Sequence, residues 1–119
     1  MWPARLSGKQ RQGQLYEQQA LAYLREQGLR LVEANFRCDC GEIDLIMRDG
    51  EALVFVEVRQ RASPTHGGAA ASITPAKVRR VVRAAQTYLQ SFAQVPPCRI
   101  DVVAIDGGAL DWLRDAVQV

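Results

Sequence analysis

The chain has 119 residues, of which 48% are hydrophobic and 24% are charged, a balance typical of one globular domain. No apolar run approaches the ~20 residues of a membrane span, and none follows the first residues as in a secretory signal. Membrane and secreted classes are therefore disfavoured. The net charge of +2 arises from 15 basic and 13 acidic residues, so charge alone neither indicates nor excludes a nucleic-acid partner.

The three cysteines, Cys38, Cys40 and Cys98, are an odd number for a small chain. An odd number disfavours a disulfide framework and favours a reducing, cytoplasmic location. Cys38 and Cys40 are separated by one residue rather than two, and the chain has a single histidine, which disfavours a zinc site. We expect small, half-buried thiols.

Composition divides the chain into an arm and one domain. Residues 1–12 are polar and basic and predict a flexible arm, and residues 13–119 predict a single domain. Residues 29–33 predict a short strand or turn, and residues 62–73 predict a loop because they are small and contain glycine and proline. The expected order of helix, β-hairpin, helix and strand predicts an α/β layer fold, with helices packed on a mixed sheet.

Residues 14–27 predict the first helix, and Gly28 provides a stop signal at its end. Glu17 lies on the apolar stripe of this helix, so its carboxylate is directed toward the core side. The alternative is an edge residue whose stem packs while its carboxylate stays in water. The apolar residues of the stripe are Ala20, Leu21 and Leu24.

Residues 41–61 predict a β-hairpin, because Asp49 and Gly50 separate two β-rich runs. A two-residue turn at these positions sets the register of the two strands. The expected cross-strand pairs are Arg48 with Glu51, Asp44 with Phe55, and Glu42 with Glu57.

The two faces of this hairpin differ in polarity. One face is wholly apolar and is expected to be core: Ile43, Leu45, Met47, Ala52, Val54, Val56 and Val58. The other face is apolar near the turn (Ile46, Leu53 and Phe55) and charged at its far end (Glu42, Asp44, Glu57 and Arg59).

The charged end of the hairpin needs a cation, because neighbouring carboxylates repel one another. In the expected register Asp44 and Glu57 are diagonal neighbours whose side chains can converge. The cation is either a divalent metal such as Mg²⁺, which prefers carboxylate oxygens, or an arginine in a surface ion pair. The candidate arginines are Arg37, Arg59 and Arg61.

Thr74 and Pro75 predict the start of a second helix, as the N-cap and the first helical residue. Its first half carries four basic residues that either bind DNA phosphates or form a solvated face: Lys77, Arg79, Arg80 and Arg83. Residues 99–105 predict a buried strand, and residues 110–119 fit either a strand or a helix.

Several motifs resemble the YraN family of bacterial proteins, which are relatives of the archaeal Holliday-junction resolvases in the PD-(D/E)XK nuclease superfamily. The most specific are Gly41-Glu42-Ile43-Asp44-Leu45-Ile46 and Val54-Phe55-Val56-Glu57-Val58. Weaker matches are Glu17-x-x-Ala20-x-x-Tyr23-Leu24, Asn35-Phe36-Arg37 and Arg99-Ile100-Asp101-Val102-Val103.

This resemblance implies a restriction-endonuclease-like three-layer core, with a mixed sheet and a central β-hairpin flanked by helices. It also implies that Asp44 and Glu57 bind one or two Mg²⁺ or Mn²⁺ ions, and that Glu17 completes the acidic site. The family pattern has a catalytic lysine two residues after Glu57, where this chain has Arg59. Arginine retains the positive charge but cannot act as a general base.

The resemblance therefore predicts a metal-dependent endonuclease for structured or branched DNA, with Glu17, Asp44, Glu57 and Arg59 as catalytic residues. It also implies a homodimer, by analogy with the resolvases. Because of Arg59, the alternative is a nucleic-acid-binding protein that retains the nuclease fold without turnover. A protein-interaction module is a third hypothesis, since the net charge is small.

Overall fold

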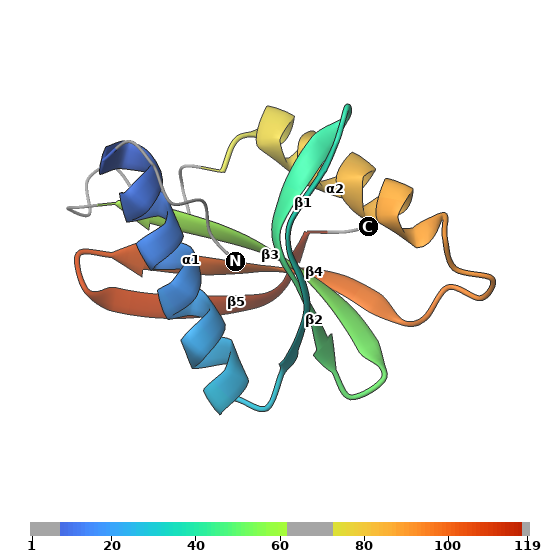
Figure 1. Cartoon of the computed structure of the whole chain (residues 1–119), viewed down its shortest axis with the longest axis horizontal. Coiled ribbons are helices and arrows are strands. Elements are labelled where there is room, and N and C mark those ends of the chain that lie inside the picture. The colour runs from blue at the N-terminus through green and yellow to red at the C-terminus, as the bar shows by residue number, and fades with distance from the viewer. Residues whose placement is uncertain (1–7, 62–72, 118–119) are drawn as a thin grey trace.

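The computed structural model describes residues 8–61 and 73–117 (Figure 1). The chain forms an α/β fold with two helices and a five-stranded mixed sheet, as predicted. Its elements are α1 (Gly8–Glu26), β1 (Arg30–Cys38), β2 (Gly41–Asp49), β3 (Ala52–Arg61), α2 (Pro75–Leu89), β4 (Cys98–Asp106) and β5 (Ala109–Val117). Neither helix in the described ranges is long and apolar enough to cross a membrane.

The strands follow the order β1-β2-β3-β4-β5, and only β3 and β4 are parallel (Figure 1). The helices cover opposite faces of the sheet, which gives three layers. The core under α1 contains Ala20, Leu24, Leu45, Met47, Val54, Val56, Val103 and Ile105. The core under α2 contains Ile43, Ile46, Leu53, Phe55, Val81, Ala84, Ala85, Leu89 and Ile100.

Both helices were found by their sequence signals, but α1 is longer than predicted. It begins at Gly8, inside the expected arm; residues 1–7 lie outside the described ranges. Residues 9–12 are lysine, glutamine and arginine, which favour helix without adding an apolar stripe. At α2, the Thr74 side chain accepts a hydrogen bond of 3.2 Å from the Lys77 backbone N–H, as predicted for an N-cap.

The other elements differ from prediction mainly in extent. The expected short strand at residues 29–33 is a full strand, β1, that pairs with β2 along its length. The strand predicted at residues 99–105 is confirmed as β4, and the ambiguous C-terminal segment is the strand β5. The expected loop at residues 62–73 lies outside the described residues except for Ile73.

The predicted register of the β2–β3 hairpin is wrong by two residues. Gly50 and Glu51 form the turn, and Asp49 pairs with Ala52. The first central residue of the turn is Gly50, and its φ is +61°. Glycine adopts a positive φ without strain, so this position suits Gly50 better than Asp49. A shift of two keeps each side chain on its predicted face, but continuing the observed register places Asp44 opposite Glu57 rather than diagonal to it.

Ile43 is the exception to the predicted faces, because it packs under α2 while Leu45 packs under α1. On β1, Asn35 lies between the residues that pair with Leu45 and Ile43. Its backbone is in the left-handed region (φ 57°), a conformation that asparagine tolerates better than most residues. Ala34 packs with the α1 core, but Phe36 packs with the α2 core. The outer half of the β1–β2 hairpin therefore turns toward α2, as Figure 1 shows.

Gly41 lies where this hairpin meets α2, and its substitution by alanine is expected to destabilise the fold by about 1–3 kcal/mol. The reason is that an added Cβ would collide with the carbonyl oxygen of Arg80. Chemical denaturation measures the effect. Gly13→Ala is the matched control: a Cβ there meets nothing within 4 Å, and alanine in a helix is worth about 0.5–1 kcal/mol over glycine. Equal effects of the two substitutions would contradict the packing.

Candidate active site

Asp44 and Glu57 lie side by side where β2 separates from β3. The paired register of the two strands ends at Leu45 and Val56, each of which is adjacent in sequence to one of the two carboxylates. The Val58 backbone N–H donates a hydrogen bond of 2.8 Å to Asp44 Oδ2. In a continued strand pair this N–H would bond to a backbone carbonyl of β2, and here the Asp44 carboxylate accepts the bond instead. The hydrogen bond fixes the position of the Asp44 carboxylate beside Glu57.

Burial favours the protonated form of both carboxyl groups. The pKa of Glu57 is raised to about 9, mainly by burial and also by the charge and hydrogen bond of Asp44. Burial also raises the pKa of Asp44, although hydrogen bonds from the Glu57 carboxyl and the Val58 N–H lower it. A buried acid pair of this kind is stabilised by a proton or by a metal cation.

Arg59 partly neutralises the pair. Its Nη1 lies 3.4 Å from Glu57 Oε2, and its side chain is 23% exposed. Its charge lowers the pKa of Glu57, as does that of Lys77, but burial outweighs both. Of the two cations predicted from the sequence, the arginine is thus present, and because the pKa of Glu57 stays raised, a further positive charge beside it is favourable.

Glu17 approaches the acid pair from α1. The pKa of Glu17 is raised to about 7, mainly by burial and also by the charges of Asp44 and Glu42, while a hydrogen bond with Asn35 opposes the shift. Its Oε1 is buried and has no hydrogen-bond partner. The expectation that Glu17 faces the apolar side is confirmed, and the structure leaves one of its oxygens in need of a donor or a cation.

The acids do not form a three-ligand metal cluster. Among the residues that the structure describes, no three His, Cys, Asp or Glu side chains are grouped closely enough to hold an ion. Glu17 and Asp44 interact through their charges, since the charge of Asp44 raises the pKa of Glu17. A metal held by Asp44 and Glu57 would take its other ligands from backbone oxygens, water or substrate, as Mg²⁺ commonly does.

A cavity of about 150 Å³ opens beside Glu57 and brings α2 into the site. Its wall is formed by Glu42, Glu57, Arg59, Lys77, Arg80 and Val81. Of the four predicted nucleic-acid-binding residues, Lys77 and Arg80 thus lie beside the acids. Arg79 and Arg83 are exposed on α2 and do not line the cavity.

Asn35 and Glu42 contribute to the site without having been assigned to it from the sequence. Glu42 lies on the predicted charged face, lines the cavity and pairs with Arg37 at 3.5 Å. Asn35 belongs to a motif noted in the sequence, and its backbone lies in the left-handed region while its side chain forms a hydrogen bond with Glu17. A left-handed residue in a strand has no clear signature in the amino-acid pattern.

The raised pKa values predict that the metal-free protein loses stability as pH rises. The folded state retains a proton that the unfolded chain releases between the ordinary pKa of Glu57, 4.5, and its folded value of about 9. The stabilisation is complete below pH ~4.5 and is lost as pH rises through ~9. Glu17 acts in the same direction up to about pH 7.

We therefore expect the melting temperature in a chelator to fall between pH 5 and pH 9. In the Glu57→Gln variant the fall is expected to be smaller, because this group no longer titrates. Differential scanning fluorimetry at matched ionic strength measures both curves. A melting temperature that rises over this range in the wild type, or identical slopes in the two proteins, would contradict the pKa shifts.

Comparison with known proteins shows which proteins the chain is similar to. The model of the "Uncharacterised protein family UPF0102" matches residues 16–105. A UPF0102 protein of Cupriavidus metallidurans is 60% identical over 119 residues, which cover 98% of this chain and 89% of the relative. A UPF0102 protein of Herminiimonas arsenicoxydans is 56% identical over 106 residues, covering 89% and 86%. The matched range includes every candidate residue from Glu17 to Arg83.

Proposed function

The chain belongs to the uncharacterised protein family UPF0102, as its YraN-like motifs predicted, and we propose that it is a metal-dependent endonuclease. The substrate class is structured or branched DNA, as the resemblance to resolvases implies. The observation that carries the proposal is the buried pair of Asp44 and Glu57 beside a cavity lined by Lys77 and Arg80. We further propose a cytoplasmic location and a homodimer.

The donor set of the acid pair fits a hard divalent cation. Asp44 and Glu57 offer carboxylate oxygens, and the unpartnered Oε1 of Glu17 offers a further acceptor for a metal-bound water. One or two Mg²⁺ or Mn²⁺ ions bound by Asp44 and Glu57 would activate water and polarise a phosphate oxygen.

The positive side chains have complementary roles toward a phosphodiester. Lys77 and Arg80 bind backbone phosphates that enter the cavity. Arg59 directs its planar guanidinium at the phosphate that is cut, where negative charge develops. Arg59 cannot remove a proton at ordinary pH, so the proton of the attacking water passes to a carboxylate or to solvent.

The second candidate is a nucleic-acid-binding protein without turnover. The contact of 3.4 Å between Arg59 and Glu57 favours it, because an arginine paired with a ligand carboxylate competes with a metal for that oxygen. The two candidates share the DNA-binding surface and differ only in whether Glu57 becomes free to bind a cation when substrate enters.

Cleavage of a labelled four-way DNA junction distinguishes the two candidates. In Mg²⁺ or Mn²⁺, the wild type is expected to cut, Glu57→Ala to be inactive, and Arg59→Lys to cut at least as fast as the wild type. Equal cutting by Glu57→Ala would contradict the assigned site. Salt-sensitive binding without cutting by either the wild type or Arg59→Lys would favour the second candidate.

Replacing both Lys77 and Arg80 with alanine is expected to weaken binding to duplex and branched DNA alike. Each lost phosphate contact reduces the slope of log affinity against log salt by about 1, so the double variant should lose about 2. Fluorescence anisotropy at several salt concentrations measures the slope. Arg79→Ala with Arg83→Ala is the matched control, because these residues do not line the cavity. A larger loss in the control pair would place the DNA elsewhere on α2.

A further inference from the structure

The turn of the β1–β2 hairpin carries two cysteines that the proposed function does not use. Cys38 pairs with Gly41 at the end of the strands, and Cys40 lies in the turn itself. The two Sγ atoms are 2.6 Å apart, compared with about 2.05 Å in a covalent disulfide. Both thiols are free and only partly buried, so a small molecule can reach them.

The surroundings of the two thiols differ. The pKa of Cys38 is lowered, mainly by its hydrogen bond with the Cys40 thiol and also by the Cys40 backbone. A lower pKa raises the fraction of thiolate, which is the nucleophilic form. Cys40 Sγ lies 3.3 Å from Thr87 Oγ1 on α2. The Thr87 hydroxyl donates to the Arg83 carbonyl at 2.9 Å, so the single S–H of Cys40 donates toward Thr87 while Cys38 is protonated and toward Cys38 once Cys38 is a thiolate.

Neither a stabilising cross-link nor a metal site explains this arrangement. A disulfide between Cys38 and Cys40 closes a loop of three residues, which restricts the unfolded chain little. In the described part of the chain no third His, Cys, Asp or Glu completes a metal cluster with the two cysteines. Close sulfurs, partial exposure and a lowered pKa are instead typical of a reactive dithiol.

We propose that Cys38 and Cys40 form a reversible redox pair that reacts with low-molecular-weight disulfides of the glutathione class. The Cys38 thiolate attacks glutathione disulfide, so that a mixed disulfide forms and one glutathione thiolate leaves. Cys40 then releases its proton, and its sulfur attacks Cys38 Sγ and displaces the second glutathione thiolate. The pair loses two electrons and two protons, which convert one glutathione disulfide into two glutathione thiols.

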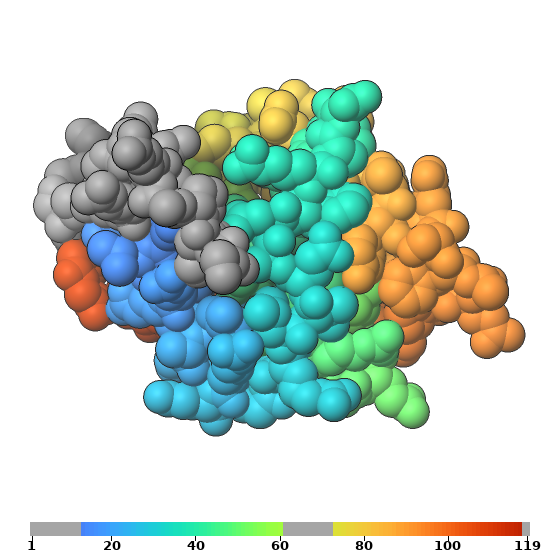
Figure 2. Space-filling model, in the orientation of Figure 1, coloured from blue at the N-terminus to red at the C-terminus, as the bar shows by residue number. Residues whose placement is uncertain are grey.

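Oxidation changes the contact between the hairpin tip and α2. A disulfide has no S–H, so the hydrogen bond from Cys40 to Thr87 is lost. The next residue, Gly41, packs directly on the backbone of Arg80, which lines the cavity beside Glu57. Figure 2 shows the outer part of the β1–β2 hairpin reaching α2 at the protein surface. A change in the oxidation state of the two cysteines is thus transmitted through Gly41 to Arg80 in the cavity wall, and this does not depend on which ligand the cavity binds.

Equilibration of the full chain with mixtures of reduced and oxidised glutathione tests the pair. After quenching and alkylation, intact mass and peptide mapping identify each cysteine. The wild type should take up one alkyl group rather than three, with Cys38 linked to Cys40 by a disulfide and Cys98 alkylated. Cys40→Ser should accumulate glutathione on Cys38, and Cys38→Ser should react about tenfold more slowly. Cys98→Ser is the matched control and should behave as the wild type.

Three results would overturn the proposal. The first is a wild type in which Cys38 and Cys40 both stay alkylated in excess glutathione disulfide. The second is a stable glutathione adduct on Cys38 in the presence of Cys40. The third is a disulfide that involves Cys98. Circular dichroism of each variant establishes that it is folded, and none of these readouts depends on nuclease activity.

Discussion

Glu57→Gln is expected to abolish DNA cleavage while making the metal-free protein more stable at alkaline pH. Loss of a metal ligand removes several kcal/mol of transition-state stabilisation, which corresponds to a fall in rate of roughly 10³-fold or more. The same substitution removes a buried carboxyl whose ionisation is disfavoured by burial and by Asp44. Cleavage kinetics at saturating Mg²⁺ and denaturation in chelator at pH 9 measure the two effects.

The opposite signs of these effects separate a catalytic role from a structural one. Glu51→Gln is the matched control, since this exposed glutamate lies in the hairpin turn. It should leave both rate and stability within error of the wild type. If Glu57→Gln lost activity only because it unfolded, its stability in chelator would fall rather than rise, and the account of the acid pair would be wrong.

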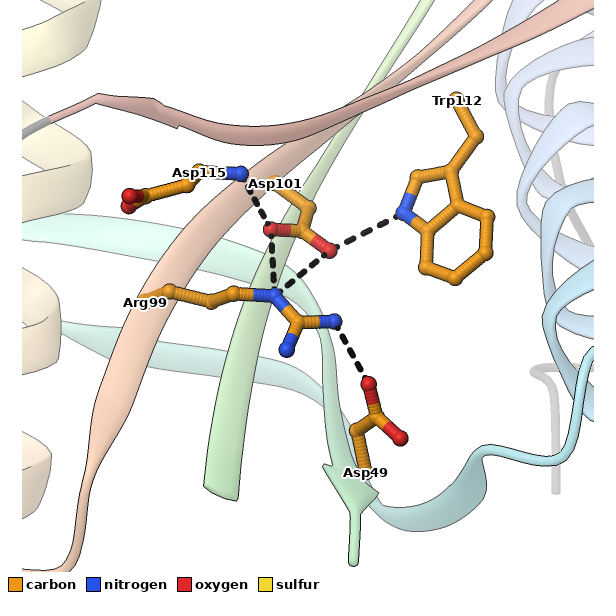
Figure 3. A network of polar contacts seen from close by, with 5 residues as sticks. All are labelled: Asp49, Arg99, Asp101, Trp112 and Asp115. Carbon is orange, nitrogen blue, oxygen red and sulfur yellow. Dashed lines mark hydrogen bonds and ion pairs between the residues drawn. The ribbon is translucent and has the colours of Figure 1, made fainter.

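Asp101→Ala is expected to lower the free energy of unfolding by about 3–5 kcal/mol. Asp101 is fully buried on β4, and its carboxylate accepts hydrogen bonds from several donors (Figure 3). Arg99 Nε lies 3.0 and 3.2 Å from its two oxygens, Trp112 Nε1 lies 2.9 Å from Oδ2, and the Asp115 backbone N–H lies 2.8 Å from Oδ1. Removing the carboxylate leaves these donors, one of them charged, without their partner.

Two further variants test this reasoning by chemical denaturation. Trp112→Phe removes one neutral donor but retains an aromatic ring, and is expected to cost about 1–2 kcal/mol. Arg37→Ala breaks an ion pair whose side chains are 76% and 53% exposed, and is expected to have an effect below about 1 kcal/mol. A cost of Asp101→Ala no larger than that of Trp112→Phe would contradict a network centred on Asp101.

The fold was predictable wherever a local signal decided it. The apolar periodicity of α2, its Thr74 cap and the β-rich runs on either side of Gly50 each identified an element correctly. The hairpin register was not predictable to the residue, because Asp49–Gly50 and Gly50–Glu51 both provide a glycine turn. The first residues of α1 were missed because they favour helix by propensity alone.

The candidate site was predictable in its acids but not in its environment. Alternation along two strands was enough to place Asp44 and Glu57 on one face. The bend at Asn35, which turns the outer hairpin toward α2, depends on tertiary packing that no local pattern encodes. The same bend brings Cys40 to Thr87 and Gly41 to Arg80, so these contacts were visible only in the structure.

Calorimetric titration of the DNA-free protein with Mn²⁺ at pH 8, comparing wild type with Asp44→Asn, tests most directly whether the acid pair is a metal site. The wild type should bind Mn²⁺ with proton release, because the metal displaces the proton that the raised pKa of Glu57 keeps bound at pH 8. The release is detected as a dependence of the heat on the ionisation enthalpy of the buffer. Asp44→Asn should lose this binding. Unchanged binding by Asp44→Asn, or none by the wild type, would contradict the account.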